Sequence, residues 1–210
     1  MITSKKIFLL LIIIICSRFS TNAQSTDKGT RSLTKWERKF GEVKHGNNVY
    51  QKGSNWLNIG FGKSYHLETE SYNQNIALAG YFRYKAVFFN AGWHFSTPEI
   101  VNWKPFKIVR SVEYLNDFHA GAGLRFEDRW YHFGFFIGPS WATTLVPNEE
   151  NPKISTLNHQ LGAHVELQLI YKYFYDMGVG VSLYGSFNKR YQVAGVQLTF
   201  YFSNAFITKY

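Results

Sequence analysis

Apolar residues alternate with small or polar residues along most of the chain after Ser54, and this period of two limits the fold more than any other feature. Successive side chains of a β-strand point to opposite faces, so the alternation predicts strands with one apolar and one polar face. It is clearest from 157 to 169, where Leu161 and Val165 fall on one face and His164 on the other. We predict eight strands, over residues 55–65, 74–84, 86–96, 115–126, 129–142, 157–169, 172–186 and 191–203.

The same alternation fits two kinds of closed barrel. A soluble carrier barrel turns its apolar face inward, whereas a membrane barrel turns that face outward into lipid and keeps a polar interior. The polar face here carries ionisable residues and glycines, which favours the membrane arrangement. Aromatic residues also recur near the predicted strand ends, as in the girdles that membrane barrels place at the two lipid–water interfaces. These residues are Trp56, Tyr84, Trp93, Tyr131, Trp141, Tyr173, Tyr175 and Tyr201.

The predicted connections between strands alternate in length. Those around Lys85, Glu127-Asp128 and Ile170-Tyr171 are tight, whereas most connections on the opposite side are long, namely 66–73, 97–114 and 143–156. Outer-membrane barrels have short periplasmic turns and longer external loops. The fold class that we predict is therefore all-β: an eight-stranded antiparallel up-and-down transmembrane β-barrel.

The N-terminus has the layout of a secretory signal peptide. Lys5 and Lys6 precede an uninterrupted apolar run, and Ala23 offers a small residue at a cleavage site before Gln24. The run is nine residues long, whereas a membrane-spanning helix needs about 20. We expect cleavage after Ala23 and export, with an uncleaved anchor as the alternative. The one cysteine, Cys16, lies within this leader, so the mature chain offers no thiol for disulfides or metal binding.

Three parts follow from these patterns: a signal peptide at 1–23, a basic N-terminal periplasmic segment at 24–53 and the barrel at 54–210. The formal charge of +9 is uneven, because 24–53 holds seven basic and three acidic residues. The body at 54–210 holds thirteen basic and eleven acidic residues, so nucleic acid is not an expected partner.

The basic N-terminal segment allows three interpretations. A helical stripe of apolar residues, Leu33, Trp36, Phe40 and Val43, favours a short amphipathic helix at the membrane interface. The segment could instead plug the periplasmic mouth of the barrel or contact a periplasmic partner. Its Gly, Asn and Ser content is also compatible with a disordered tether.

Ionisable residues on the polar face form two predicted tiers inside the barrel. The tier nearer the periplasm contains Arg83, Arg125, His132, Glu166 and Asp176. Charges removed from bulk water need partners, so we predict a salt-bridged network that fills the lumen, with separately solvated charges as the alternative.

The outer tier contains His66, His94, Asp117 and His119, a combination that could bind zinc or act as a general base. The first and third strands are not neighbours, and lumen histidines more often form hydrogen bonds. We therefore predict neither a metal nor a cofactor, and His66, His94 and His119 are the candidate ligands should a metal bind.

The architecture over 54–210 resembles that of small outer-membrane β-barrel proteins of Gram-negative bacteria. The leader ending in Ala23-Gln24 and the aromatic-rich strands are similar to barrels of the Bacteroidota, and Phe200-Tyr201-Phe202 is similar to the aromatic end of their last strand. The resemblance implies an outer-membrane location, contact with membrane lipids and lipopolysaccharide, and insertion by the barrel assembly machinery.

For such a barrel we predict a non-enzymatic structural or surface-interaction role, with binding through external loops, where function usually resides. The alternative is a lipid A-modifying enzyme. The deacylase signature is absent from the nearest segment, Tyr184–Asn188, and no serine-containing motif accompanies His66, the residue that best fits the acyltransferase type. A narrow pore is the third possibility.

Overall fold

A computed structural model describes residues 40–98, 114–147, 155–189 and 191–209. The predicted signal peptide at 1–23, residues 99–113 of the loop at 97–114 and residues 148–154 of the loop at 143–156 lie outside these residues. Among the described residues, no helix is both long enough and apolar enough to cross a membrane.

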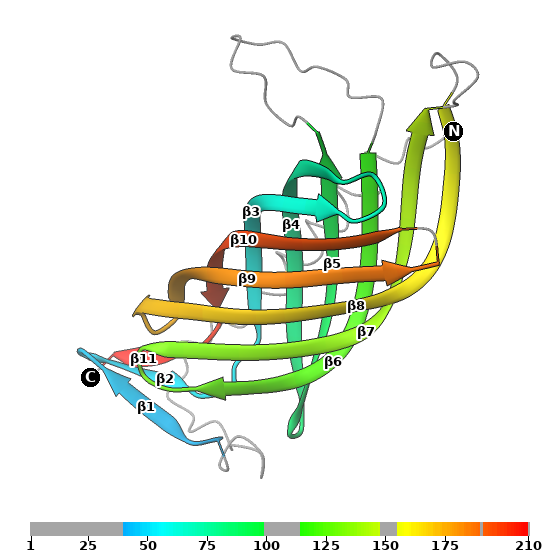
Figure 1. Ribbon diagram of the computed structural model, residues 1–210. Coiled ribbons are helices and arrows are strands. Elements are labelled where there is room, and N and C mark those ends of the chain that lie inside the picture. Colours follow the sequence, from blue (N-terminus) through cyan, green and yellow to red (C-terminus); the bar gives the residue numbers. More distant parts are fainter. Residues whose placement is uncertain (1–39, 99–113, 148–154, 190, 210) are drawn as a thin grey trace, which may run out of the picture. The chain divides into compact units, whose positions relative to one another are not determined.

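Eight strands form a closed antiparallel barrel (Figure 1). Each strand pairs with the next along the chain, and the last pairs with the first, for example Thr199 with Gly60. The prediction of an eight-stranded up-and-down barrel is confirmed. The strands are β3 (Trp56–His66), β4 (Ser71–Tyr84), β5 (Val87–Thr97), β6 (Tyr114–Glu127), β7 (Tyr131–Pro147), β8 (Ser155–Phe174), β9 (Met177–Asn188) and β10 (Gln192–Ser203).

The turn between β8 and β9 lies five residues later than the sequence suggests. We predicted a tight turn at Ile170-Tyr171, but both residues are paired within β8, and the turn is formed by Tyr175 and Asp176. Ile170 is apolar but fully buried on the inner face, where the pattern predicts a polar residue. It therefore resembles a break in the alternation, although the alternation of inner and outer faces continues to Lys172.

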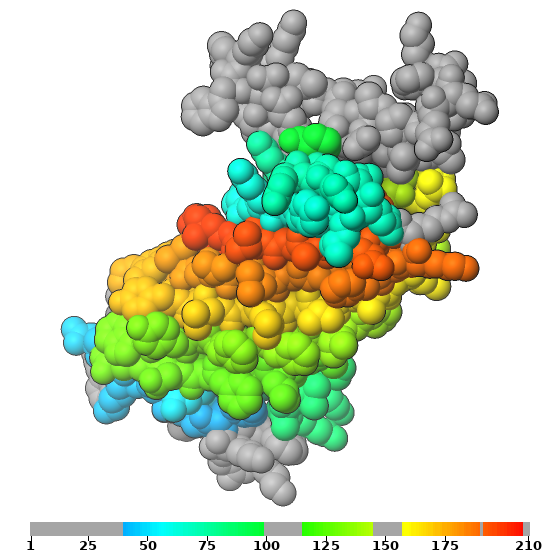
Figure 2. All heavy atoms as spheres, in the orientation of Figure 1, coloured from blue at the N-terminus to red at the C-terminus, as the bar shows by residue number. Residues whose placement is uncertain are grey.

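The apolar face of the sheet points outward, as expected for a membrane barrel. Leu161 is 72% exposed and Leu169 57% exposed, whereas Glu166 and Gln168 on the same strand are buried. Figure 2 shows the outer surface formed by β8 in yellow, β9 in orange and β10 in red. An interior rich in asparagine, histidine and serine, surrounded by exposed leucine and phenylalanine, is the reverse of a soluble barrel.

Most of the predicted interface aromatics lie on the outer face. Tyr84, Tyr131, Trp141 and Tyr173 are exposed, and Trp93 is half-buried.

The prediction was wrong for Trp56, Tyr201 and Tyr175, which are all fully buried. Trp56 lies on the same inner face of β3 as Asn58, and Tyr201 lies on the same inner face of β10 as Thr199. Nearness to a strand end does not decide which face of the sheet a side chain occupies. The period of two decides which face a residue occupies.

A second, three-stranded sheet contains β1 (Glu42–His45), β2 (Asn48–Gln51) and β11 (Phe206–Lys209). Gly46 has a φ of +60° in the turn between β1 and β2, a conformation that favours glycine and suits a tight hairpin. Tyr50 packs against Tyr175 and Ala205 in a small core.

This sheet corrects two expectations. Val43, part of the predicted helical stripe, lies in a β-strand that pairs with β2, while Leu33 and Trp36 lie outside the described residues. The barrel itself ends at Ser203 instead of at Tyr210, because residues 206–209 pair with β2.

Candidate functional site

The interior of the barrel holds ionisable residues in separate clusters. We call the end of the barrel with the β4–β5, β6–β7 and β8–β9 turns the turn end, and the opposite end the loop end.

Arg125, Glu127 and Lys172 form an ion cluster inside the turn end. Glu127 Oε1 lies 2.9 Å from Arg125 Nη2 and 2.9 Å from Lys172 Nζ. Glu127 Oε2 accepts a 2.9 Å hydrogen bond from the backbone N–H of Gly53. Arg125 donates to the carbonyl of Ser54 at 2.7 Å and to the hydroxyl of Tyr201 at 2.8 Å. The buried charges are therefore paired and hydrogen-bonded, which is the condition for their removal from water.

Aromatic rings fill the space beside this ion cluster. Trp56 stacks on Tyr81 with ring centroids 4.5 Å apart and an angle of 2° between the rings. Phe88 and Phe136 pack against the same group. Phe40, before β1, packs edge-on against Phe88 with centroids 6.1 Å apart. We call Trp56, Tyr81, Phe88, Phe136 and Tyr201 the aromatic plug.

The five residues of the predicted lumen network occupy different environments. Arg125 belongs to the ion cluster, and His132 packs edge-on against Trp56 at 4.8 Å. Glu166 lies farther along the barrel, where its carboxylate accepts hydrogen bonds from Tyr81 at 2.8 Å and from Gln168 at 2.9 Å.

The other two predicted network residues lie at the margin of the barrel. Arg83 donates to the carbonyl of Lys52 at 3.2 Å and lies over the ring of Phe40. Asp176 is not on a strand at all, because it forms part of the β8–β9 turn. The predicted network omits Glu127, which the sequence places in a turn, and Lys172, which follows the misplaced turn at 170–171.

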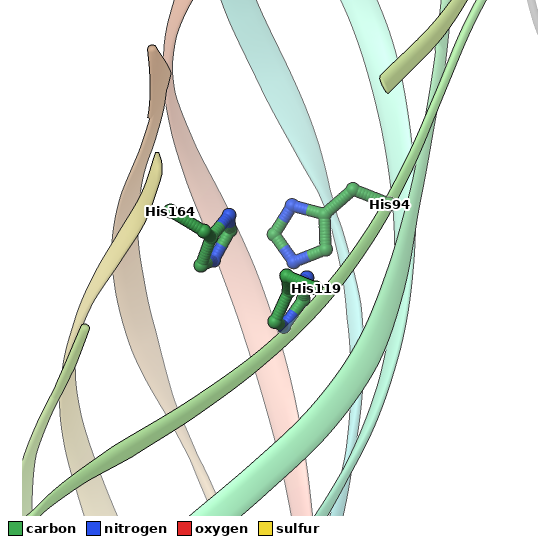
Figure 3. Close-up of side chains that lie close together, drawn as sticks. All are labelled: His94, His119 and His164. Atoms are coloured by element: carbon green, nitrogen blue, oxygen red, sulfur yellow. The ribbon is translucent and has the colours of Figure 1, made fainter. Parts of the chain in front are cut away.

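Three histidines converge inside the barrel nearer the loop end (Figure 3). His94 comes from β5, His119 from β6 and His164 from β8, and one ring nitrogen from each lies within 4.8 Å of the others. The rings of His119 and His164 stack with centroids 3.8 Å apart, and His94 lies edge-on to both, at 5.0 and 4.9 Å. We call these residues the histidine cluster.

Small residues on the neighbouring strands make room for these rings. Gly92 is paired with His119, and a Cβ atom at Gly92 would lie 2.5 Å from His119 Nε2. On β7, Ser140 is paired with His119 and Gly138 with His164. The strand between the two histidines therefore presents little side-chain bulk, which allows the rings to stack across it.

The histidine cluster is buried but poorly satisfied. The three side chains are 1–5% exposed. Among the described residues, Nδ1 of His94 and both ring nitrogens of His119 and His164 have no hydrogen-bond partner. Asp117 Oδ2 lies 3.5 Å from Nδ1 of His164, within ion-pair distance. Buried polar groups are usually hydrogen-bonded, so several unpartnered nitrogens in one place are unusual.

Sequence reasoning named His94 and His119 as candidate ligands, and the structure brings these two together. It missed His164, because β8 is separated from β6 by a whole strand. The signal that could have indicated His164 is the pairing of inward-facing histidines with glycine or serine on the neighbouring strands.

His66, the remaining candidate, belongs to a different cluster at the loop end. Its Nε2 lies 3.1 Å from Ser96 Oγ and accepts a 3.0 Å hydrogen bond from Asn73. Its Nδ1 contacts the hydroxyl of Tyr191, and Ser64 Oγ lies 2.7 Å from Ser96 Oγ. His66 is thus a hydrogen-bonded histidine with two serines nearby, although no serine had been assigned to it from the sequence.

The clusters and the outward apolar face define a small barrel of the outer-membrane type. No protein-family model matches the chain, and no curated protein matches it in sequence. Three solved structures share its fold. Neisserial surface protein A is 10% identical, with a TM-score of 0.52 over 71% of this chain and 95% of that one.

The other two structures are similar to the same extent. The N-terminal β-barrel domain of Pseudomonas aeruginosa OprF is 13% identical, with a TM-score of 0.50 over 72% of this chain and 100% of that one. Ail, the attachment invasion locus protein of Yersinia pestis, is 11% identical, with a TM-score of 0.51 over 74% of this chain and 99% of that one. The chain therefore has the fold of small eight-stranded outer-membrane β-barrels.

Proposed function

We propose that the chain is a sealed outer-membrane barrel with a structural or surface-interaction role. The observation that carries this proposal is the interior of the turn end. There, the ion cluster of Arg125, Glu127 and Lys172 lies beside the aromatic plug, and the side chains of Arg125 and Glu127 are only 1% and 6% exposed. An eight-stranded barrel is just wide enough for its own side chains to fill. A lumen filled in this way has no continuous path for water or solutes.

The proposed placement is with the turn end in the periplasm and the loop end outside the cell. Short turns face the periplasm and longer connections face outward in barrels of this class. The chain reaches this location by export through the signal peptide at 1–23 and insertion by the barrel assembly machinery. Its exposed aromatic residues, such as Tyr131 and Trp141, then contact lipid and lipopolysaccharide.

Two measurements test this proposal. The refolded protein should produce no conductance steps in a planar lipid bilayer, and stable single-channel steps would favour a narrow pore instead. If the external connection at 97–114 binds a partner, shortening it should abolish surface binding, whereas lumen variants that still fold should leave binding unchanged. The opposite pattern would place the function inside the barrel.

One contact favours a second candidate function, the hydrolysis or transfer of an ester-linked acyl chain. A serine hydroxyl beside an imidazole is the arrangement of an activated nucleophile. Ser96 Oγ lies 3.1 Å from His66 Nε2, a nitrogen to which Asn73 also donates. Both side chains are only 1–2% exposed, so the sealed barrel remains the better-supported function. The lipid A mass profile of a deletion strain separates the two: a shift that Ser96→Ala reproduces would support the enzyme, and an unchanged profile would exclude it.

A further inference from the structure

We propose that His94, His119 and His164 bind one divalent transition-metal ion, zinc foremost, inside the barrel. This site is independent of whether the barrel is sealed. It departs from the expectation that the chain binds no metal, an expectation that leaves His164 out.

The donor set is the first reason. Three imidazoles are a common ligand set for zinc, and the same set suits copper, nickel and cobalt. Calcium and magnesium take oxygen ligands and are disfavoured. The three histidines come from β5, β6 and β8, so the ligands are held by a rigid sheet and not by mobile loops.

Distance is the second reason. Zinc–nitrogen bonds of about 2.0–2.1 Å place the nitrogens of a tetrahedral site about 3.4 Å apart. The ligand atoms of the histidine cluster already lie within 4.8 Å of one another. The rings of His119 and His164 must turn out of their parallel stack before their in-plane lone pairs converge on one ion, a change of side-chain torsions and not of the strands. The absence of a Cβ atom at Gly92 leaves His119 room for such a rotation.

The unpartnered polar atoms are the third reason. Both ring nitrogens of His119 lack a hydrogen-bond partner among the described residues, and the buried carboxylate of Asp117 meets His164 at 3.5 Å. Leaving such groups buried and unpaired costs about 1–3 kcal/mol each, more if they are charged. A cation at the centre of the cluster would coordinate the nitrogens and balance the charge of Asp117.

Asp117 also has a positioning role in this proposal. Metal-bound histidines usually donate their second ring N–H to a carboxylate, which fixes the orientation of the ring. Asp117 Oδ2 lies 3.5 Å from Nδ1 of His164 and is itself buried. This contact leaves Nε2 of His164 available to the metal.

The experiment measures zinc bound to the full chain after refolding in detergent micelles. Because the cluster is buried, zinc is present during refolding and excess metal is removed by gel filtration before the metal content is determined. We expect about one zinc per chain in the unaltered protein, and less than a tenth of that in His119→Gln and His164→Gln, each of which removes a ligand. Asp117→Asn should retain the site with about 10–100-fold weaker affinity.

His132→Gln is the matched control. His132 is fully buried and both its ring nitrogens are also unpartnered in the described chain, but it packs against Trp56 and Tyr201, away from the cluster. This variant should bind as much zinc as the unaltered protein. Zinc lost equally from all histidine variants would overturn the proposal, as would zinc kept in His119→Gln and His164→Gln.

A second measurement does not depend on the folding of any variant. Zinc X-ray absorption of the unaltered protein should show three imidazole ligands. Fewer than three, or no zinc retained at micromolar concentration, would show that the cluster is satisfied in another way, such as by water or by a proton shared with Asp117.

Discussion

The guanidinium carbon of Arg125 lies 4.3 Å from the centre of the Trp56 ring, within reach of a cation–π interaction. The same guanidinium pairs with Glu127 and donates to Tyr201. One side chain therefore joins the ion cluster to the aromatic plug. The stability of the turn end should depend on it.

Arg125→Met tests the ion cluster. Removing one member of a buried charge network typically costs about 3–5 kcal/mol, because the remaining charges lose their partner. We expect the free energy of unfolding to fall by about that amount in urea titrations of the protein in micelles. Arg129→Met is the control, since Arg129 is exposed where it contacts His45 and the Trp130 ring, and its loss should cost less than about 1 kcal/mol. Unchanged stability and conductance in Arg125→Met would refute the ion cluster as a structural element.

Trp56→Ala tests the aromatic plug. Trp56 is fully buried and stacks on Tyr81, so its truncation leaves a cavity and should destabilise the barrel by about 3–5 kcal/mol. Tyr84→Ala is an outer-face control, because Tyr84 is 64% exposed. Equal effects of the two substitutions in the same unfolding assay would contradict the placement of Trp56 inside the barrel.

Gly92→Ala tests the space beside the histidine cluster. The new Cβ would lie 2.5 Å from His119 Nε2 and 2.8 Å from Ala79 Cβ, so the His119 ring must move. We expect zinc content to fall several-fold while the chain still folds. Gly80→Ala, whose Cβ would meet only the side chain of Phe82 at 3.3 Å, should keep its zinc. A normal zinc content in Gly92→Ala would show that the ring position is unimportant.

His45, in the three-stranded sheet, provides a test by pH. Partial burial, followed by the nearby charge of Arg129, lowers the pKa of His45 below its usual value of 6.5. The neutral ring accepts a 3.2 Å hydrogen bond from Arg129 Nε. Because the pKa is lower in the folded chain, the contact is intact above the ordinary value and is weakened as the pH falls through the lowered pKa. NMR titration should give a value below 6.5, and Arg129→Gln should raise it; a value above 6.5 would contradict the contact.

The fold was predictable because one physical rule governs every strand. A sheet that separates lipid from a polar interior must alternate apolar and polar residues. Leu161, which faces outward, and His164, which faces the lumen, follow that rule. The error in the β8–β9 turn arose where a residue departs from this rule. Ile170 is apolar yet faces inward beside the aromatic plug. Because of this one residue, the turn is predicted too early and Lys172 is left out of the predicted lumen network.

The clusters were less predictable because they depend on contacts between distant strands. His164 approaches His119 across β7 only because Gly138 and Ser140 occupy the strand between them. Likewise, Glu127 meets Lys172 through the stagger of β6 against β8, which the alternation of residues does not specify. The alternation of residues predicts which side chains face the lumen, but not which of those side chains contact one another.

The pairing of β2 with β11 has a consequence for how the barrel holds together. β3 and β10 form its seam, the one place where the first strand of the barrel meets the last. Residues just before β3 and just after β10 are joined again outside the barrel, where the N–H of Gln51 donates to the carbonyl of Ala205 at 2.7 Å. Separating β3 from β10 at the turn end therefore also requires the hydrogen bonds between β2 and β11 to break. The second sheet thus stabilises the barrel against opening between its first and last strands.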